Sequence, residues 1–236
     1  MERKMDHHSD LGGDLNNMDI IESPIDPSMQ KEYQDLSGSV NFENVNYQEV
    51  LTEAEQLFAG DTPTEAKKRI MILLAHLGTI ESAKILEKYL MVSDEGLKDW
   101  AVLSLKECRV SLESVLLKEE GGFISTGLGG RGRKLRYYFV VSTREGRPLT
   151  DAEKQTIEER FKKSGDDYGS EIEEIILESN YAMIGILAPT DVAVGEVIEE
   201  GIWQCNRRGQ VLSKDYYVTN VKKPTKEKIL KYLQDV

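Results

Sequence analysis

The chain has 236 residues, of which 39% are hydrophobic and 31% charged, a composition typical of a soluble globular protein with room for two small domains. No stretch approaches the roughly 20 apolar residues of a membrane span, the N-terminal segment lacks the apolar centre of a secretory signal, and two cysteines cannot build a disulfide framework. We therefore expect a cytoplasmic protein without membrane contact.

The net charge of −12 is concentrated in the N-terminal quarter, because residues 1–65 contain 3 basic and 15 acidic residues while the rest contain 27 of each sign. Glycines and prolines interrupt any helical pattern in residues 1–46. This predicts an acidic tail that is disordered, or that folds onto a partner or onto its own domain. Its apolar residues are candidate partner-binding anchors: Leu11, Leu15, Met18, Ile20, Ile21 and Ile25.

Residues 47–120 have the periodicity of amphipathic helices. Apolar residues recur at three- and four-residue spacing in five segments, with breaks predicted at Gly60, Gly78, Ser93 and Ser111. Short helices joined by tight loops form a small bundle or a fragment of a helical solenoid.

The segment LKDWAVLSLKEC, residues 97–108, resembles the second helix of a HEAT-type repeat, with Leu97, Ala101 and Leu105 at the packing positions. The segment TEAKKRIMILLAHLG, residues 64–78, fits a helix of the preceding unit. This resemblance covers about residues 64–108 and implies a module that binds a protein, or packs on its own neighbouring domain, and performs no chemistry itself.

Residues 121–133 form a linker rich in glycine and arginine. Its N–H groups are candidates for holding an anion, and its arginines for adding bidentate contacts to phosphate or carboxylate. The run lacks the GxxxxGK[ST] pattern of a P-loop and precedes a strand, so it is not a nucleotide fingerprint. A flexible linker and close packing that needs glycine stay open as alternatives. The candidate residues are Gly129, Gly130, Arg131, Gly132 and Arg133.

Residues 134–236 alternate between strand and helix in the order β-α-β-β-α-β, followed by a terminal helix. This order is that of the ferredoxin-like split βαβ arrangement. We therefore predict an α+β fold, in which a short HEAT-like helical bundle precedes a ferredoxin-like domain. Two helices are expected on one face of the sheet, and the other face is expected to be open to solvent, a ligand, the helical domain or another subunit.

Basic residues gather in two segments, with a net charge of +5 over residues 131–147 and +6 over residues 206–231. Tyrosines at 137, 138, 216 and 217 lie on the flanking strands, and aromatics near arginines on an open sheet favour binding of single-stranded RNA. The RNP pattern is absent, however, and paired tyrosines are also ordinary strand residues. Further candidates for contact with an anion or nucleic acid are Arg136, Arg144, Arg147, Lys222 and Lys223.

No catalytic, cofactor-binding or metal-binding set is predicted, because the three histidines lie apart and no Ser/His/Asp or Cys/His set is present. The leading prediction is a non-enzymatic scaffold or regulatory subunit that binds another protein through its helices, its tail and its open sheet face. The alternatives are an RNA- or ribosome-associated protein and a sensor of a small anionic ligand. Homo-oligomerisation stays open.

Overall fold

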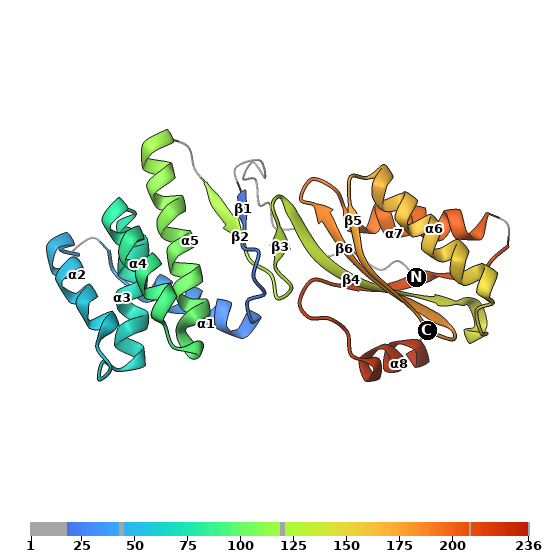
Figure 1. Cartoon of the computed structure of the whole chain (residues 1–236), viewed down its shortest axis with the longest axis horizontal. Helices are drawn as coiled ribbons and strands as arrows, with labels where there is room; N and C mark the ends of the chain where they lie inside the picture. Colours follow the sequence, from blue (N-terminus) through green and yellow to red (C-terminus); the bar gives the residue numbers. More distant parts are fainter. Residues whose placement is uncertain (1–17, 43–44, 119–120, 208, 236) are drawn as a thin grey trace, which may run out of the picture.

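The computed structural model describes residues 18–42, 45–118, 121–207 and 209–235, which form two lobes side by side (Figure 1). The chain is mixed α+β, as predicted. The helical lobe contains α1 (Pro27–Ser39), α2 (Tyr47–Glu53), η2 (Ala54–Phe58), α3 (Thr64–Leu77), α4 (Ile80–Val92) and α5 (Glu95–Leu117). A ribbon of β1 (Met18–Ile20) and β2 (Gly122–Ile124) lies between the lobes.

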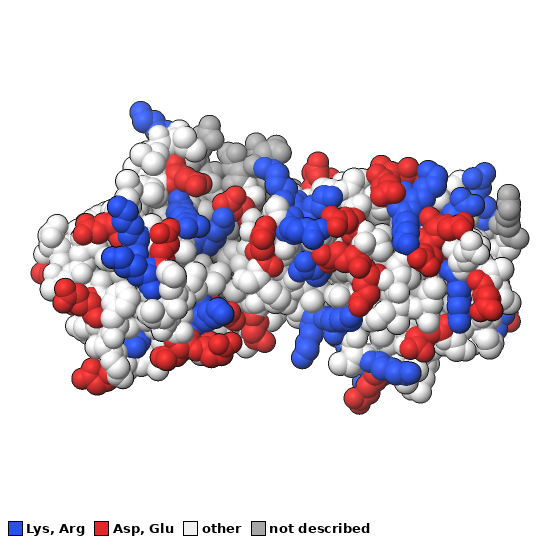
Figure 2. All heavy atoms as spheres, in the orientation of Figure 1, with Lys and Arg blue, Asp and Glu red and all other residues white. Residues whose placement is uncertain are grey.

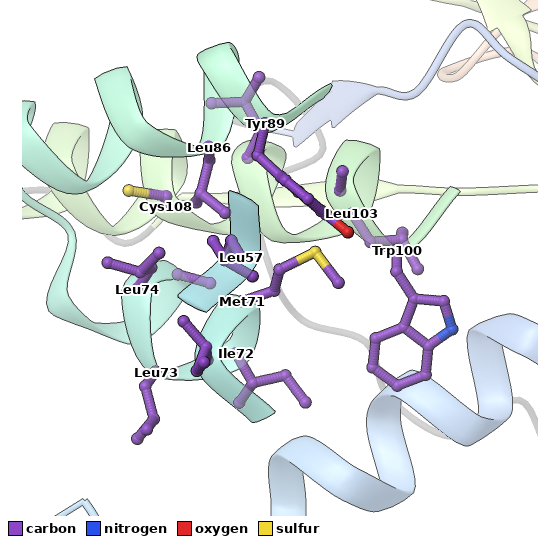
Figure 3. Close-up of a cluster of buried hydrophobic side chains, with 14 of the residues drawn as sticks. Leu57, Met71, Ile72, Leu73, Leu74, Leu86, Tyr89, Trp100, Leu103 and Cys108 are labelled. Carbon is purple, nitrogen blue, oxygen red and sulfur yellow. The ribbon is translucent and has the colours of Figure 1, made fainter. Parts of the chain in front are cut away.

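The core of the helical lobe lies where α3, α4 and α5 meet (Figure 3). Met71, Leu86, Tyr89 and Trp100 are each at most 2% exposed there. Burial of such large apolar side chains is the main favourable contribution to folding, at about 1.5–3 kcal/mol for each aliphatic side chain. This core holds together helices that are individually too short to be stable in water.

Local sequence marks the connection between α3 and α4. Gly78 ends α3 in the left-handed region, with φ of +54°, and the Thr79 hydroxyl caps α4 by accepting the Ser82 N–H at 3.1 Å. The predicted break at Ser111 is wrong, because α5 runs without interruption to Leu117. No glycine or proline lies between residues 97 and 120 to end it. Among the described residues, no helix is both long and apolar enough to cross a membrane.

The described part of the predicted tail belongs to the helical lobe. Strand β1 pairs in parallel with β2, with Met18 opposite Gly122. Helix α1 begins after Asp26, whose side chain accepts the Ser28 N–H at 2.8 Å, and Tyr33 on α1 is buried in the helical core. We call residues 18–26 the N-terminal strap. Residues 1–17 of the predicted tail lie outside the described residues.

The second lobe, here the α/β lobe, is built on one antiparallel sheet with the strand order β7-β4-β6-β5, to which β3 adds a short hairpin on β4. Its elements follow the predicted β-α-β-β-α-β order with a terminal helix. They are β3 (Gly130–Arg131), β4 (Lys134–Thr143), η3 (Arg144–Gly146), α6 (Asp151–Asp167), β5 (Glu171–Leu177), β6 (Tyr181–Pro189), α7 (Val194–Asn206), β7 (Leu212–Thr219) and α8 (Lys226–Asp235).

Helices cover both faces of this sheet (Figure 1). Helices α6 and α7 pack on one face, where Phe161 lies 5.4 Å from Phe139 of β4. Helix α8 packs on the other face, where Ile229 is buried against Val140 and Met183. The expectation of an open second face is therefore wrong, because the amphipathic terminal helix buries its own apolar stripe there.

Candidate nucleic-acid interface

The glycine-rich linker is packed against the N-terminal strap. Gly129 and Gly130 are buried, and a Cβ on Gly129 would lie 2.1 Å from the carbonyl oxygen of Glu22. The Gly130 N–H donates to that same oxygen at 3.2 Å, and the Gly132 N–H donates to Glu22 Oε1 at 2.8 Å. These N–H groups therefore have acceptors within the chain, and Gly129 and Gly130 serve close packing, which was one of the open alternatives.

The arginines around this linker are paired with carboxylates of β5. Arg131 Nη2 lies 2.5 Å from Glu171 Oε1. Arg136 forms a bidentate pair with Glu173, at 2.6 and 3.1 Å, and donates to the Leu128 carbonyl at 2.9 Å. The backbone carbonyl of Arg133 accepts the Thr190 N–H at 3.3 Å. Arg131 and Arg136 thus fasten the linker to the sheet edge.

The second face of the sheet offers no open row of aromatics. Lys223 Nζ lies 2.5 Å from Glu174 and 5.1 Å from the ring centroid of Tyr138. Lys228 lies 5.2 Å from the ring centroid of Tyr217. Both tyrosines are half-buried against the core beneath α8, while Lys222 is exposed. The predicted stacking surface for RNA is therefore not formed.

The apolar anchors of the predicted tail contact the chain's own fold. Ile20, Ile21 and Ile25 are buried, and half-buried Met18 lies on β1 against Gly122. The Ile21 N–H donates to the Ile124 carbonyl at 3.0 Å. The two remaining anchors, Leu11 and Leu15, lie outside the described residues.

Three arginines meet at the end of the α/β lobe that is remote from the helical lobe. Arg147, Arg160 and Arg207 line a cavity of about 620 Å³, between the start of α6, the end of α7 and the loop after it. Glu153 is the one carboxylate among the described residues that line this cavity. Exposed Arg144 lies next to it, because its N–H donates to the carbonyl of Val211, a lining residue, at 3.0 Å. We call this cavity the basic pocket.

Glu153 holds Arg147 at the basic pocket and also caps α6. Its carboxylate forms a bidentate pair with Arg147, at 2.6 and 3.0 Å, and accepts the Thr150 N–H at 2.9 Å. The Thr150 hydroxyl in turn accepts the Glu153 N–H, which completes a capping box. The Arg147 guanidinium, together with the Thr150 N–H, lowers the pKa of Glu153 to about 2.

Replacing Glu153 with glutamine is expected to flatten the acid dependence of stability. The folded pKa of about 2 lies below the ordinary value of 4.5, so the unfolded chain binds the proton first as the pH falls. The ion pair stabilises the fold above about pH 5, and this contribution is lost as the pH falls toward 2. Urea midpoints measured from pH 7 to pH 3 should fall less steeply in E153Q than in the wild type.

Glutamine can still cap the helix, so E153Q removes the charge and keeps the capping box. Glu159→Gln on the same helix is the matched control, because Glu159 faces the Gln155 amide at 2.9 Å instead of an arginine. If E153Q and the wild type have the same pH dependence, the assigned ion pair does not contribute to stability.

A tryptophan on α7 stands beside the basic pocket. Trp203 is 56% exposed, and Arg207 Cζ lies 5.0 Å from its ring centroid. Trp203 itself lines a second cavity, of about 700 Å³, together with Tyr168, three glutamates and Lys214. We call it the acidic pocket, and its glutamates are Glu196, Glu199 and Glu200.

Two site residues of this region, Arg144 and Arg147, were predicted from the sequence. The other three, Arg160, Arg207 and Trp203, were not. Trp203 and Arg207 are four residues apart, a spacing that places two side chains on the same helix face. The apolar stripe of α7, which includes Ile198 and Ile202, is buried. A large aromatic residue outside that stripe was the signal in the sequence that could have identified Trp203.

The chain matches no known protein family and no curated protein. Several solved structures resemble part of it, and two of them are described here. One is a protein of Deinococcus radiodurans R1 named as a transposase, with a TM-score of 0.39, 17% identity, and coverage of 43% of this chain and 90% of that one. The other is a REP-associated tyrosine transposase bound to a REP hairpin, with a TM-score of 0.33, 14% identity, and coverage of 43% and 61%.

Both structures bear the name transposase, which disagrees with the predictions of a non-enzymatic protein and of a protein-binding scaffold or regulatory subunit, and these predictions are withdrawn. The alternatives of RNA or ribosome association and of an anion sensor are withdrawn with them. The HEAT-type resemblance gains no support, since no family matches. With TM-scores below 0.5, neither likeness assigns an activity to this chain.

Proposed function

We propose that the α/β lobe binds DNA, with the phosphates of one strand lying in the basic pocket. The observation that carries this proposal is the meeting of Arg147, Arg160 and Arg207 at one cavity with a single carboxylate, Glu153. Arginine presents a planar fork of donors that matches phosphate, and phosphate contacts supply most of the affinity of nucleic-acid binding. DNA is taken as the probe because transposases act on DNA, while the pocket's geometry carries the proposal.

The distribution of charge elsewhere on the molecule supports this choice of site. On the face seen in Figure 2, basic and acidic side chains alternate over both lobes. Arg131 of the linker and Arg136 of β4 are each paired with a glutamate, Glu171 and Glu173 respectively. The lining of the basic pocket includes three arginines and one carboxylate, which is paired with Arg147, so positive charge is available for an anion.

We further propose that the α/β lobe is ferredoxin-like and forms a domain that begins near residue 134. The antiparallel order β7-β4-β6-β5 and the helix positions support this assignment. We propose that the helical domain covers residues 47–120 together with the strap and α1, with residues 121–133 as the linker. A fold of this kind hosts many functions, so the proposed DNA contact rests on the pocket alone.

Arg160→Gln is expected to weaken binding of a fluorescein-labelled 20-nucleotide single strand about tenfold, because a charge-assisted contact to phosphate is lost. The slope of log K against log salt should fall by about 0.7, the value for one phosphate contact on a single strand. Fluorescence anisotropy between 50 and 200 mM salt measures both quantities on the full chain.

Lys162→Gln is the matched control for this experiment. It removes one positive charge from the same helix, but Lys162 is paired with Glu158 at 2.6 Å and does not line the basic pocket. The proposal is overturned if the wild type binds no DNA at 50 mM salt, or if the two variants lose affinity equally. Tighter binding of RNA of the same sequence would overturn the assignment to DNA.

A further inference from the structure

We infer that the site takes single-stranded DNA and that Trp203 is the platform on which one unpaired base stacks. This inference rests on the proposed function and specifies its ligand. The chain has two tryptophans, of which Trp100 is 1% exposed and Trp203 is 56% exposed. An indole ring left half in water on a helix surface loses the benefit of burial, unless something covers it in a complex.

The position of Trp203 relative to the basic pocket suits a nucleotide. Arg207 lines the pocket and lies 5.0 Å from the indole centroid, so one residue belongs to both features. Gln204, adjacent to Trp203 in sequence, also lines the pocket. A base on the indole would therefore place its own phosphate within reach of the Arg207 guanidinium. Aromatic stacking beside a positively charged groove is the usual mode of single-strand binding.

The acidic pocket determines how the bound strand is oriented on α7. Its charged lining residues are Glu196, Glu199, Glu200 and Lys214, so its net charge is negative and disfavours phosphate. The backbone must then run over the basic side, while the base extends over the indole toward the glutamates. Carboxylates accept hydrogen bonds from exocyclic amino groups of bases, as on cytosine. The two pockets thus separate the backbone of the strand from its bases.

Duplex DNA cannot use this platform, because its bases are stacked on one another and present only their edges in the grooves. Only an unpaired or extruded base offers a face to Trp203. The inference therefore predicts a preference for single strands that the basic pocket alone does not explain, since duplex DNA has the higher density of phosphate charge.

The test is a titration of the full chain, monitored by tryptophan fluorescence. One titration uses an unlabelled 12-nucleotide single strand, and the other uses the corresponding duplex. The single strand is expected to quench the fluorescence, and the duplex to leave it nearly unchanged. Trp100 lies in the core of the other lobe, so the quenching reports on Trp203. Trp203→Ala should weaken single-strand binding about 10- to 100-fold, and Trp203→Phe should retain most of the affinity.

Each outcome separates this inference from the proposed function. If neither DNA binds to the wild type, the proposed function fails and the inference fails with it. If DNA binds and Arg160→Gln weakens it, but W203A binds as well as the wild type, the inference alone is overturned. Equal affinity for duplex and single strand would overturn it as well. Far-UV circular dichroism of W203A and W203F establishes that both variants are folded.

Discussion

Replacing Trp100 with alanine is expected to lower the free energy of unfolding of the helical lobe by about 3–5 kcal/mol. The indole is 1% exposed, lies 5.2 Å from the ring of Tyr33 on α1, and has Lys68 Nζ at 4.9 Å from its centroid. Its removal leaves a cavity between α1 and α5, because a close-packed interior relaxes only partly. Urea denaturation followed by far-UV circular dichroism measures the loss.

Leu116→Ala provides the control in the same helix, since Leu116 is 68% exposed and its loss should change stability by less than about 0.5 kcal/mol. In the Trp100→Ala protein, Trp203 is the remaining tryptophan, so fluorescence follows the α/β lobe alone. We expect the helical lobe to unfold at lower urea than in the wild type. A loss below about 1 kcal/mol would contradict the assigned role of Trp100.

Gly129→Ala is expected to release the N-terminal strap from the linker. Gly129 has φ of +64°, where a residue with a Cβ is disfavoured by about 1–2 kcal/mol. In addition, its Cβ would lie 2.1 Å from the Glu22 carbonyl oxygen, so the strap has to move away. Hydrogen exchange of the Ile21 and Ile25 N–H groups, which donate to the linker, should accelerate at least about tenfold.

Gly132→Ala isolates the contact from the backbone conformation. Gly132 also has a positive φ, of +57°, but no atom lies within 4 Å of the position that its Cβ would take. This variant should carry the conformational cost and leave the Ile21 and Ile25 N–H groups protected. The same exchange rates in both variants would mean that the crowding at Gly129 is relieved without moving the strap.

The period of the apolar pattern was enough to predict the order of strands and helices in residues 134–236. The strap was harder to predict. Ile20, Ile21 and Ile25 signalled a contact surface, but the partner lies within the same chain. Its recognition depends on glycines far away in the sequence, where the backbone of Glu22 approaches Gly129 and Gly130.

The candidate site, too, could be predicted from the sequence only in part. Counting charges identified Arg131 and Arg136, yet both are paired with glutamates of β5, and such cross-strand pairing is not visible in a local charge count. Arg160 and Arg207 meet only because α6 and α7 pack closely. That packing brings Phe161 against Gly201, where a Cβ would lie 2.3 Å from the ring. The pocket is therefore a product of tertiary structure.

The parallel pairing of β1 with β2 has a consequence for folding on the ribosome. Met18 lies opposite Gly122, so the strap meets its partner strand only after all of α5 has been synthesised. Helices α3, α4 and α5 make mostly local contacts and can assemble first, whereas the strap is exposed until the linker emerges. The linker gains a further contact later still, because the Leu128 N–H donates to the carbonyl of Asn220, which follows β7. A residue that follows β7 thus contributes to holding the linker to which the strap is bound.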